Sequence, residues 1–166
     1  MSERFATLLR EYEGVIIRAW ADEVYAERRT ELPARLAYGQ LVGHMPELLE
    51  ELARLLATAG SDAEIVEATR RLRSHPQVRF YQGLLLDEVA RELMLFRQVI
   101  TDFFWREGLS ARQGSFSELR DALWRANRFV DEMIAQVIIV YAASLRPPFE
   151  TRISVWPPPR RRRTDF

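Results

Sequence analysis

The chain has 166 residues, of which 48% are hydrophobic and 29% charged, a composition typical of one globular domain with a real core rather than of a disordered chain. It contains no cysteine, which excludes disulfides and thiolate chemistry, and all 24 of its basic residues are arginine. No apolar run approaches the ~20 residues of a membrane span, and the charged start is not typical of a signal peptide, so we expect a cytoplasmic protein.

The net charge of zero is distributed unevenly along the chain. Residues 145–166 carry six arginines against Glu150 and Asp165, which leaves +4 on this segment and −4 on the rest. An acidic body argues against DNA or RNA as the main ligand. Because the segment also holds five prolines, we expect a helical domain over residues 1–144 and a flexible tail over 145–166. Within that tail a weak contact with polyanions is expected from Arg160, Arg161, Arg162 and Arg163.

Apolar residues recur at three- and four-residue steps from the start of the chain, which predicts helices. A first helix is expected over residues 2–29, ending before Pro33. A second is expected over 39–58, in which Pro46 either kinks the helix or occupies the first turn of a new one. A third, over 62–74, begins at a capping box formed by Ser61 and Glu64, and Pro76 leaves its continuation open.

Two long amphipathic helices are expected to follow, over residues 85–106 and from a second capping box, Ser115 with Glu118, to about 144. The first has a heptad-like seam of Leu86, Val89, Leu93, Phe96, Ile100 and Phe103. The last has an apolar stripe of Phe116, Leu119, Leu123, Ala126, Val130, Met133, Val137 and Val140, widened by Ile134, Ile138, Ile139 and Tyr141. A helix that is apolar on more than one side needs more than one partner surface, so we expect a homodimer that forms through these two helices.

The sequence therefore predicts an all-α domain of five or six helices, either globin-like without haem or a helical bundle. His44 lies on an apolar helix face, where it is either a haem ligand or an ordinary boundary histidine. Phosphotransfer through His44 is disfavoured by the neighbouring Glu47 and by the absence of lysine. A lone histidine has no partner motif to support ligation, so we expect no bound cofactor and no metal.

A polar cluster follows at His75, Arg79, Gln82 and Gly83. Its side chains either gather as donors around a carboxylate or an anion, or consist of a helix-terminal histidine with a solvated arginine. Glu92 is the best candidate for a semi-buried carboxylate, paired with Arg97 or with Arg79 across the fold. Acid–base catalysis needs two convergent carboxylates, and the sequence offers no such pair, so we expect no enzymatic activity.

The segment RSHPQVRFYQGLLLDEVARELMLFR resembles a pattern of the amino-terminal domains of RsbT co-antagonist (RsbR-type) proteins and of many bacterial histidine kinases. The segments LVGHMPELLEELARLL and SFSELRDALWRANRFVDEMIAQVIIVYAAS are similar to other helices of that family, so the resemblance covers residues 5–144. The matching positions are His44, Pro46, His75, Arg79, Gln82, Gly83, Glu92 and Arg97.

This resemblance implies a dimeric, non-haem globin-like or helical-bundle domain that receives a signal or docks a regulatory protein in bacterial stress-response or two-component signalling. Two departures stand out: Pro76 directly follows the histidine, and no output domain follows residue 144 in this sequence. The chain is therefore expected either to act alone or to be the input part of something larger. The competing hypothesis is a globin-like sensor that binds haem or a small apolar molecule.

Overall fold

The computed structural model describes residues 3–110 and 115–145, and within these ranges the secondary structure is entirely helical. The helices are α1 (Glu3–Glu11), α2 (Glu13–Ala26), α3 (Leu32–Arg35), α4 (Tyr38–Val42), α5 (Met45–Ala57), α6 (Asp62–Arg71), α7 (Ser74–Tyr81), α8 (Leu86–Ser110) and α9 (Phe116–Leu145). The all-α fold class is confirmed. The expected tail contacts of Arg160, Arg161, Arg162 and Arg163 lie outside the described residues.

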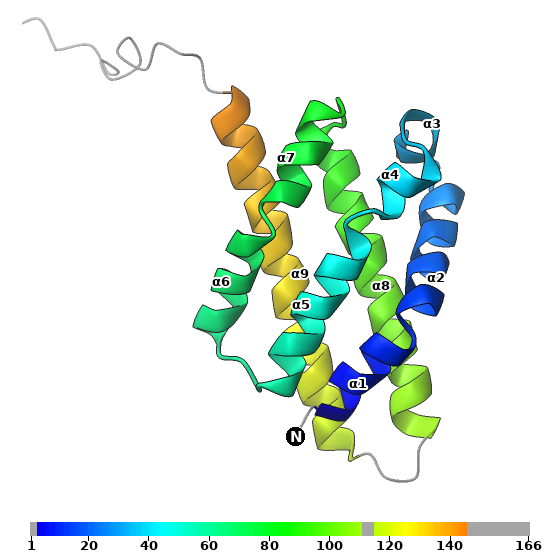
Figure 1. The fold of residues 1–166 in the computed structure, drawn as a ribbon, viewed down its shortest axis with the longest axis vertical. Coiled ribbons are helices and arrows are strands. Elements are labelled where there is room, and N and C mark those ends of the chain that lie inside the picture. The colour runs from blue at the N-terminus through cyan, green and yellow to red at the C-terminus, as the bar shows by residue number, and fades with distance from the viewer. Residues whose placement is uncertain (1–2, 111–114, 146–166) are drawn as a thin grey trace, which may run out of the picture.

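The two long helices α8 and α9 form an antiparallel pair that runs the length of an elongated bundle (Figure 1). Helix α2 packs along α8, and α6 and α7 pack along α9. Helix α5 lies in front of the α8–α9 pair in this view, and α1 packs against α5 at the end of the bundle where the chain begins. The short helices α3 and α4 lie at the opposite end, near the tip of α7.

The first predicted helix is divided at Tyr12, where the backbone leaves helical geometry (φ −106°, ψ 16°). Hydrogen bonds from the Tyr12 amide to the Leu8 carbonyl and from the Ile16 amide to the Tyr12 carbonyl nevertheless continue across the break. Gly14, a weak helix former, lies just beyond it. The kink allows α1 to pack against α5 while α2 packs against α8. We expected one helix with a single buried face, whereas the structure has two helices that pack against different partners.

The three prolines in residues 3–110 lie at helix starts, where their missing amide costs no hydrogen bond. Pro46 occupies the first turn of α5, which decides between the two alternatives that the sequence left open. Pro33 is the second residue of the short helix α3, and α2 has already ended at Ala26. Pro76 is the third residue of α7, so the chain between Ser74 and Tyr81 is a separate helix and not a continuation of α6.

Both predicted capping boxes are present. The Ser61 hydroxyl accepts from the Glu64 amide at 3.3 Å, and the Glu64 carboxylate accepts from the Ser61 amide at 2.6 Å. At the start of α9 the same reciprocal pair joins Ser115 and Glu118, at 3.1 and 3.2 Å. Each box satisfies amide donors that a helix start leaves without partners.

The predicted seam of α8 and stripe of α9 form much of the core, which they share with Phe5, Trp20, Leu48, Leu52 and Phe129. Two of the predicted core positions are wrong, because Leu86 is 40% exposed and Phe116 is 69% exposed. Both residues begin their helices, beyond the point where a neighbouring helix covers them. Tyr141, by contrast, is buried at 4% exposure.

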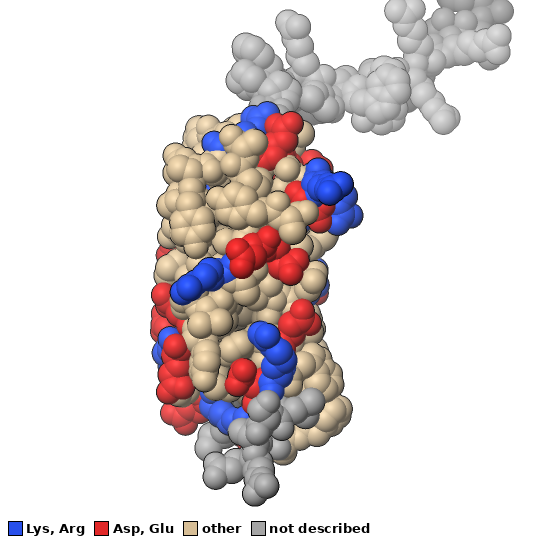
Figure 2. Space-filling model, turned by 90° about the vertical axis from the view of Figure 1, so that its right-hand side faces the viewer, with Lys and Arg blue, Asp and Glu red and all other residues tan. Residues whose placement is uncertain are grey.

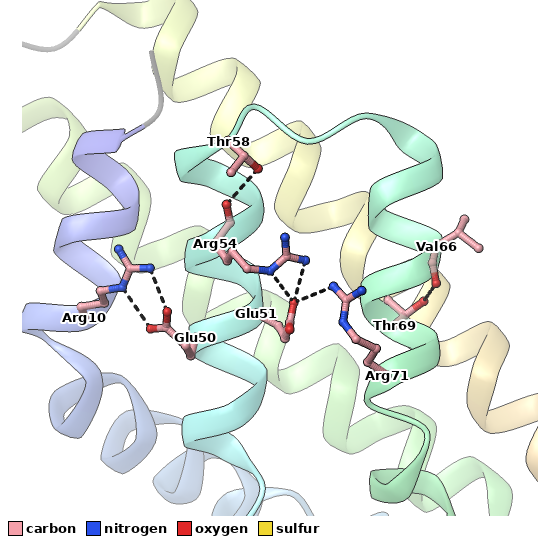
Figure 3. Close-up of polar contacts among 8 residues, drawn as sticks. All are labelled: Arg10, Glu50, Glu51, Arg54, Thr58, Val66, Thr69 and Arg71. Carbon is pink, nitrogen blue, oxygen red and sulfur yellow. Dashed lines mark hydrogen bonds and ion pairs between the residues drawn. The ribbon is translucent and has the colours of Figure 1, made fainter.

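Charged side chains of both signs are scattered over the surface, with uncharged surface between them, on the face that Figure 2 shows. Some of these charges connect neighbouring helices (Figure 3). Arg10 on α1 makes a two-point ion pair with Glu50 on α5, and Glu51 accepts from Arg54 on its own helix and from Arg71 on α6. Such exposed pairs each contribute about 0–1 kcal/mol. In the described part of the chain, no helix is long and apolar enough to cross a bilayer.

Candidate functional site

Arg79, on α7, is the centre of a buried polar cluster and has 0% exposure. Its Nε and Nη2 atoms donate to the two carboxylate oxygens of Glu92 on α8, at 3.0 and 2.7 Å. Nη2 also donates to the Leu41 carbonyl at 2.8 Å, while Nη1 donates to the Gln40 carbonyl at 3.1 Å and to the Gln82 side chain at 3.0 Å. The guanidinium therefore has an acceptor for each of its five N–H donors. The interpretation of Arg79 as a solvated arginine is wrong.

Two of these acceptors are carbonyls at the end of α4, where a helix leaves its last carbonyl groups without intrahelical partners. Arg79 thus joins three elements: it lies on α7, pairs with a carboxylate on α8 and caps α4. Helices α7 and α8 are consecutive in the chain, whereas α4 ends at Val42, well before α7 begins at Ser74. The cluster connects helices at the end of the bundle where α3, α4 and the tip of α7 lie (Figure 1).

His75 and Glu92 are both buried at 1% exposure, with His75 Nε2 lying 3.6 Å from a Glu92 carboxylate oxygen. Within the described part of the chain, neither ring nitrogen of His75 has a hydrogen-bond partner. Burial, together with the positive charge of Arg79 and the neighbouring His44 ring, holds the pKa of His75 well below 6.5, so the His75 ring is neutral. Burial raises the pKa of Glu92, against the opposing effect of the Arg79 guanidinium.

Gln82 and Gly83 lie next to the cluster, in the turn that ends α7. Gly83 has a φ of +78°, and its amide donates to the Phe80 carbonyl, while the Leu84 amide donates to the Arg79 carbonyl. This pair of bonds is the Schellman motif, which favours glycine at the left-handed position. The Gly83 carbonyl accepts from Arg35 at 3.1 Å, which connects the turn to α3. Gly83 therefore positions the turn and brings no side chain to the cluster.

Arg97 lies outside the cluster. Its guanidinium pairs with Asp131 on α9 at 2.7 Å, and both side chains are partly exposed, at 30% and 50%. Of the two partners that the sequence left open for Glu92, the structure thus selects Arg79.

Sequence reasoning missed three residues that complete this region. Trp20 on α2 donates from Nε1 to the Glu92 carbonyl at 3.1 Å. Tyr141 on α9 donates to the Leu84 carbonyl at 2.8 Å, and burial raises the pKa of its hydroxyl to about 12. The buried Glu88 accepts from the amides of Glu31 and Leu85, at 2.7 and 2.8 Å. Only Glu88 had a usable signal, because a glutamate in the first turn of a predicted helix often caps its start.

His44 is half-buried, and its ring meets the His75 ring edge-on, with 5.4 Å between the centroids. A haem-binding histidine needs a deep apolar pocket on its ligating side. Here that neighbourhood contains a second imidazole, and beyond it a guanidinium and a carboxylate. The residues around His44 do not fit a haem site. Among the described residues, no group of three or more histidine, aspartate or glutamate side chains is placed to hold a metal ion.

A second feature lies on the outside of the long helices. Trp124 and Ile138 on α9 are each 51% exposed, and Met94 on α8 is 47% exposed. Trp124, Asp131 and Ile138 follow one another at heptad spacing and so lie on one stripe of α9. The ion pair between Asp131 and Arg97 connects this stripe to α8. Of the residues that were predicted to widen the apolar stripe of this helix, Ile138 lies on this outer stripe, whereas Tyr141 is buried.

Comparison with known proteins decides what kind of domain contains these two features. A family model described as the RsbT co-antagonist protein rsbRD N-terminal domain matches residues 14–152. The chain belongs to this family. The resemblance inferred from the segment around His75 and Arg79 is thereby confirmed, and the rsbRD N-terminal domain is a regulatory signalling domain. No curated protein and no solved structure gave a significant match.

Proposed function

We propose that this rsbRD N-terminal domain is a non-enzymatic signal-input module of a bacterial stress-response or two-component system that acts in the cytoplasm through helix-mediated contacts with a regulatory protein. We further propose that it works as a homodimer whose interface is the outer stripe of α9 with the adjoining surface of α8. The exposed Trp124 and Ile138 carry this proposal. Trp124 and Ile138 lie two heptads apart on one stripe, with the ion-paired Asp131 between them. Large exposed apolar side chains that share one face of a helix are typical of a helix–helix interface.

The buried cluster supports a structural or signalling role rather than a reaction centre. Arg79 has all its donors occupied, and Glu92 and His75 are closed off from solvent. A general acid or base must reach its substrate, directly or through one water. Because Arg79 joins α4, α7 and α8, the cluster instead couples the positions of those helices, and α8 also forms part of the proposed interface.

The proposed dimer is tested by the mass of the full chain in solution, measured by multi-angle light scattering over a range of concentrations. We expect twice the 19.5 kDa chain mass for the wild type and the single-chain mass for the double variant Trp124→Glu/Ile138→Glu. Charged groups placed in an apolar interface must be desolvated without a partner when the dimer forms.

Val15→Glu is the matched control, because Val15 is an equally exposed apolar residue, at 53%, that lies on α2. This variant should keep the dimer mass. A single-chain mass for the wild type at several hundred micromolar would contradict the dimer, as would dissociation of the control variant. Recovery of a regulatory protein from cell extract by the wild type, but not by the double variant, would link the interface to signalling.

A further inference from the structure

A groove lies between α7 and α9, next to the point where α9 ends. The apolar residues that line it are Phe80, Ile139, Val140 and Ala143, and the other lining residues are Arg73, Gln77, Tyr81 and Ser144. It holds about 350 Å³, on the order of ten water volumes of ~30 Å³ each. Ile139 is 52% exposed there, so an apolar surface remains uncovered by the described part of the chain.

Arg73 supplies a positive charge at one end of this groove. Its Nε and Nη2 atoms both donate to the Gln136 side chain, at 3.3 Å, and no carboxylate among residues 3–110 and 115–145 forms an ion pair with it. Most arginines whose pairs the structure defines are matched by an acidic residue, as Arg71 and Arg128 are. The groove therefore favours a ligand that combines an apolar side chain with a nearby carboxylate.

The chain itself carries that combination just beyond α9. Residues 146–150 read Arg-Pro-Pro-Phe-Glu, and Glu150 is one of the two acidic residues in the segment 145–166. Gln136, which holds Arg73, lies nine residues before the end of α9, or about 13 Å along a helix that rises ~1.5 Å per residue. After a reversal at Arg146, the four residues 147–150 span about 13 Å when extended, at ~3.3–3.6 Å per residue. A chain that reverses at the end of α9 thus brings Phe149 to the groove and Glu150 to Arg73.

We propose that residues 147–150 fold back along α9, so that Phe149 occupies the α7–α9 groove and Glu150 pairs with Arg73. The groove uses Ile139 and the side of α9 that faces α7, whereas the proposed dimer uses Trp124 and Ile138. Occupation of the groove therefore sets the direction in which the chain leaves α9 without blocking the dimer interface.

The test is disulfide formation in the full chain, which has no cysteine of its own. Gln77→Cys places a thiol in the lining of the groove, and Thr151→Cys places one directly after Glu150. Ala142→Cys with Thr151→Cys is the matched control, because Ala142 is exposed on the last turns of α9 but does not line the groove. Under mild oxidation we expect the Gln77 pair to close about tenfold faster than the Ala142 pair, because docking raises the local concentration of one thiol at the other.

Charge variants on the Gln77–Thr151 cysteine pair test the role of Glu150. Glu150→Arg should slow closure about fivefold, and Arg73→Glu added to it should restore the rate, since the pair is then reversed but complete. Asp165→Arg makes the same charge change outside the docked segment and should leave the rate unchanged. Equal rates for the two cysteine pairs, an unchanged rate with Glu150→Arg, or a disulfide between two chains in place of one within a chain would each overturn the proposal. The altered positions are exposed or lie beyond α9, so equal thermal midpoints will show that the fold is intact in every variant.

Discussion

At the scale of single residues, the Arg79–Glu92 pair shows why an arginine occupies the centre of the bundle's polar cluster. Lysine has three donors on one nitrogen and cannot supply a planar two-point contact to a carboxylate. The guanidinium reaches a carboxylate, two backbone carbonyls and an amide oxygen on different sides. A buried charge is tolerated only when its partners are complete, and this arrangement completes them.

Removing one member of the Arg79–Glu92 pair should therefore lower the free energy of unfolding far more than removing both. We expect Arg79→Met to lower the free energy of unfolding by about 3–5 kcal/mol, because it leaves the Glu92 carboxylate buried without its counter-charge. The double variant Arg79→Met/Glu92→Met should recover much of that loss. Urea unfolding followed by circular dichroism measures both, with Arg10→Met in the exposed pair with Glu50 as a control that changes stability little. A double variant no more stable than Arg79→Met would argue against an ion pair as the source of the loss.

At the scale of elements, α5 and α7 end with the same turn but with different residues at its critical position. After α7, Gly83 takes the left-handed conformation at φ +78°. After α5, Ala59 takes it at φ +52°, and the Gly60 amide donates to the Leu55 carbonyl as the motif requires. A left-handed alanine carries strain of roughly 1–2 kcal/mol that glycine avoids. The carboxyl-terminal turn of α5 is thus a weak point of this helix.

The two turns make opposite predictions for opposite substitutions. Ala59→Gly should raise the free energy of unfolding by about 0.5–1 kcal/mol, since relief of strain exceeds the added flexibility of the unfolded chain. Gly83→Ala should lower it by about 1 kcal/mol, and the added Cβ meets only ordinary contacts, the nearest being Arg35 Nη1 at 3.4 Å. Thermal unfolding of the two variants beside the wild type checks both signs. A destabilised Ala59→Gly would contradict the strained turn.

The helix boundaries show which features of the fold could be predicted from the sequence and why others could not. Ser61 and Ser115 indicate helix starts, because their capping hydrogen bonds are local and a short stretch of sequence specifies them. The break at Tyr12 escaped prediction because the three- and four-residue spacing of apolar side chains continues through a kink. The helices α3 and α4 are too short to show a periodic pattern.

The buried cluster shows that contacts between residues distant in sequence could not be predicted either. The sequence placed Arg79 in a polar cluster and Glu92 on a partly buried helix face, but it left the partner of Glu92 open between Arg79 and Arg97. The choice depends on how α7 lies on α8, which is a tertiary property. Two of the acceptors of Arg79 are the backbone carbonyls of Gln40 and Leu41, and a carbonyl has no residue type by which a sequence could reveal it.

At the scale of the whole molecule, two buried groups make global stability depend on pH in opposite directions. The folded pKa of His75 is depressed, so its contribution is present above about pH 6.5, where the unfolded histidine is also neutral, and is lost as pH falls. The folded pKa of Glu92 is raised above 4.5, so its contribution is greatest below that pH and is lost as pH rises through the folded pKa. The pH profile of the wild type alone therefore mixes the two effects.

A comparison with His75→Leu separates them, because this variant removes only the histidine titration. Below about pH 6 the unfolded wild type binds a proton that the folded protein does not, so the difference in free energy of unfolding between wild type and variant should change by about 1.4 kcal/mol per pH unit, with the wild type losing the more. Urea unfolding at intervals from pH 7.5 to 5 measures this difference. Val89→Ala, a fully buried position without a titrating group, should shift stability by the same amount at every pH. Parallel profiles for wild type and His75→Leu would mean that the His75 ring accepts a proton in the folded bundle as readily as in water, and that acidification leaves the cluster around Arg79 undisturbed.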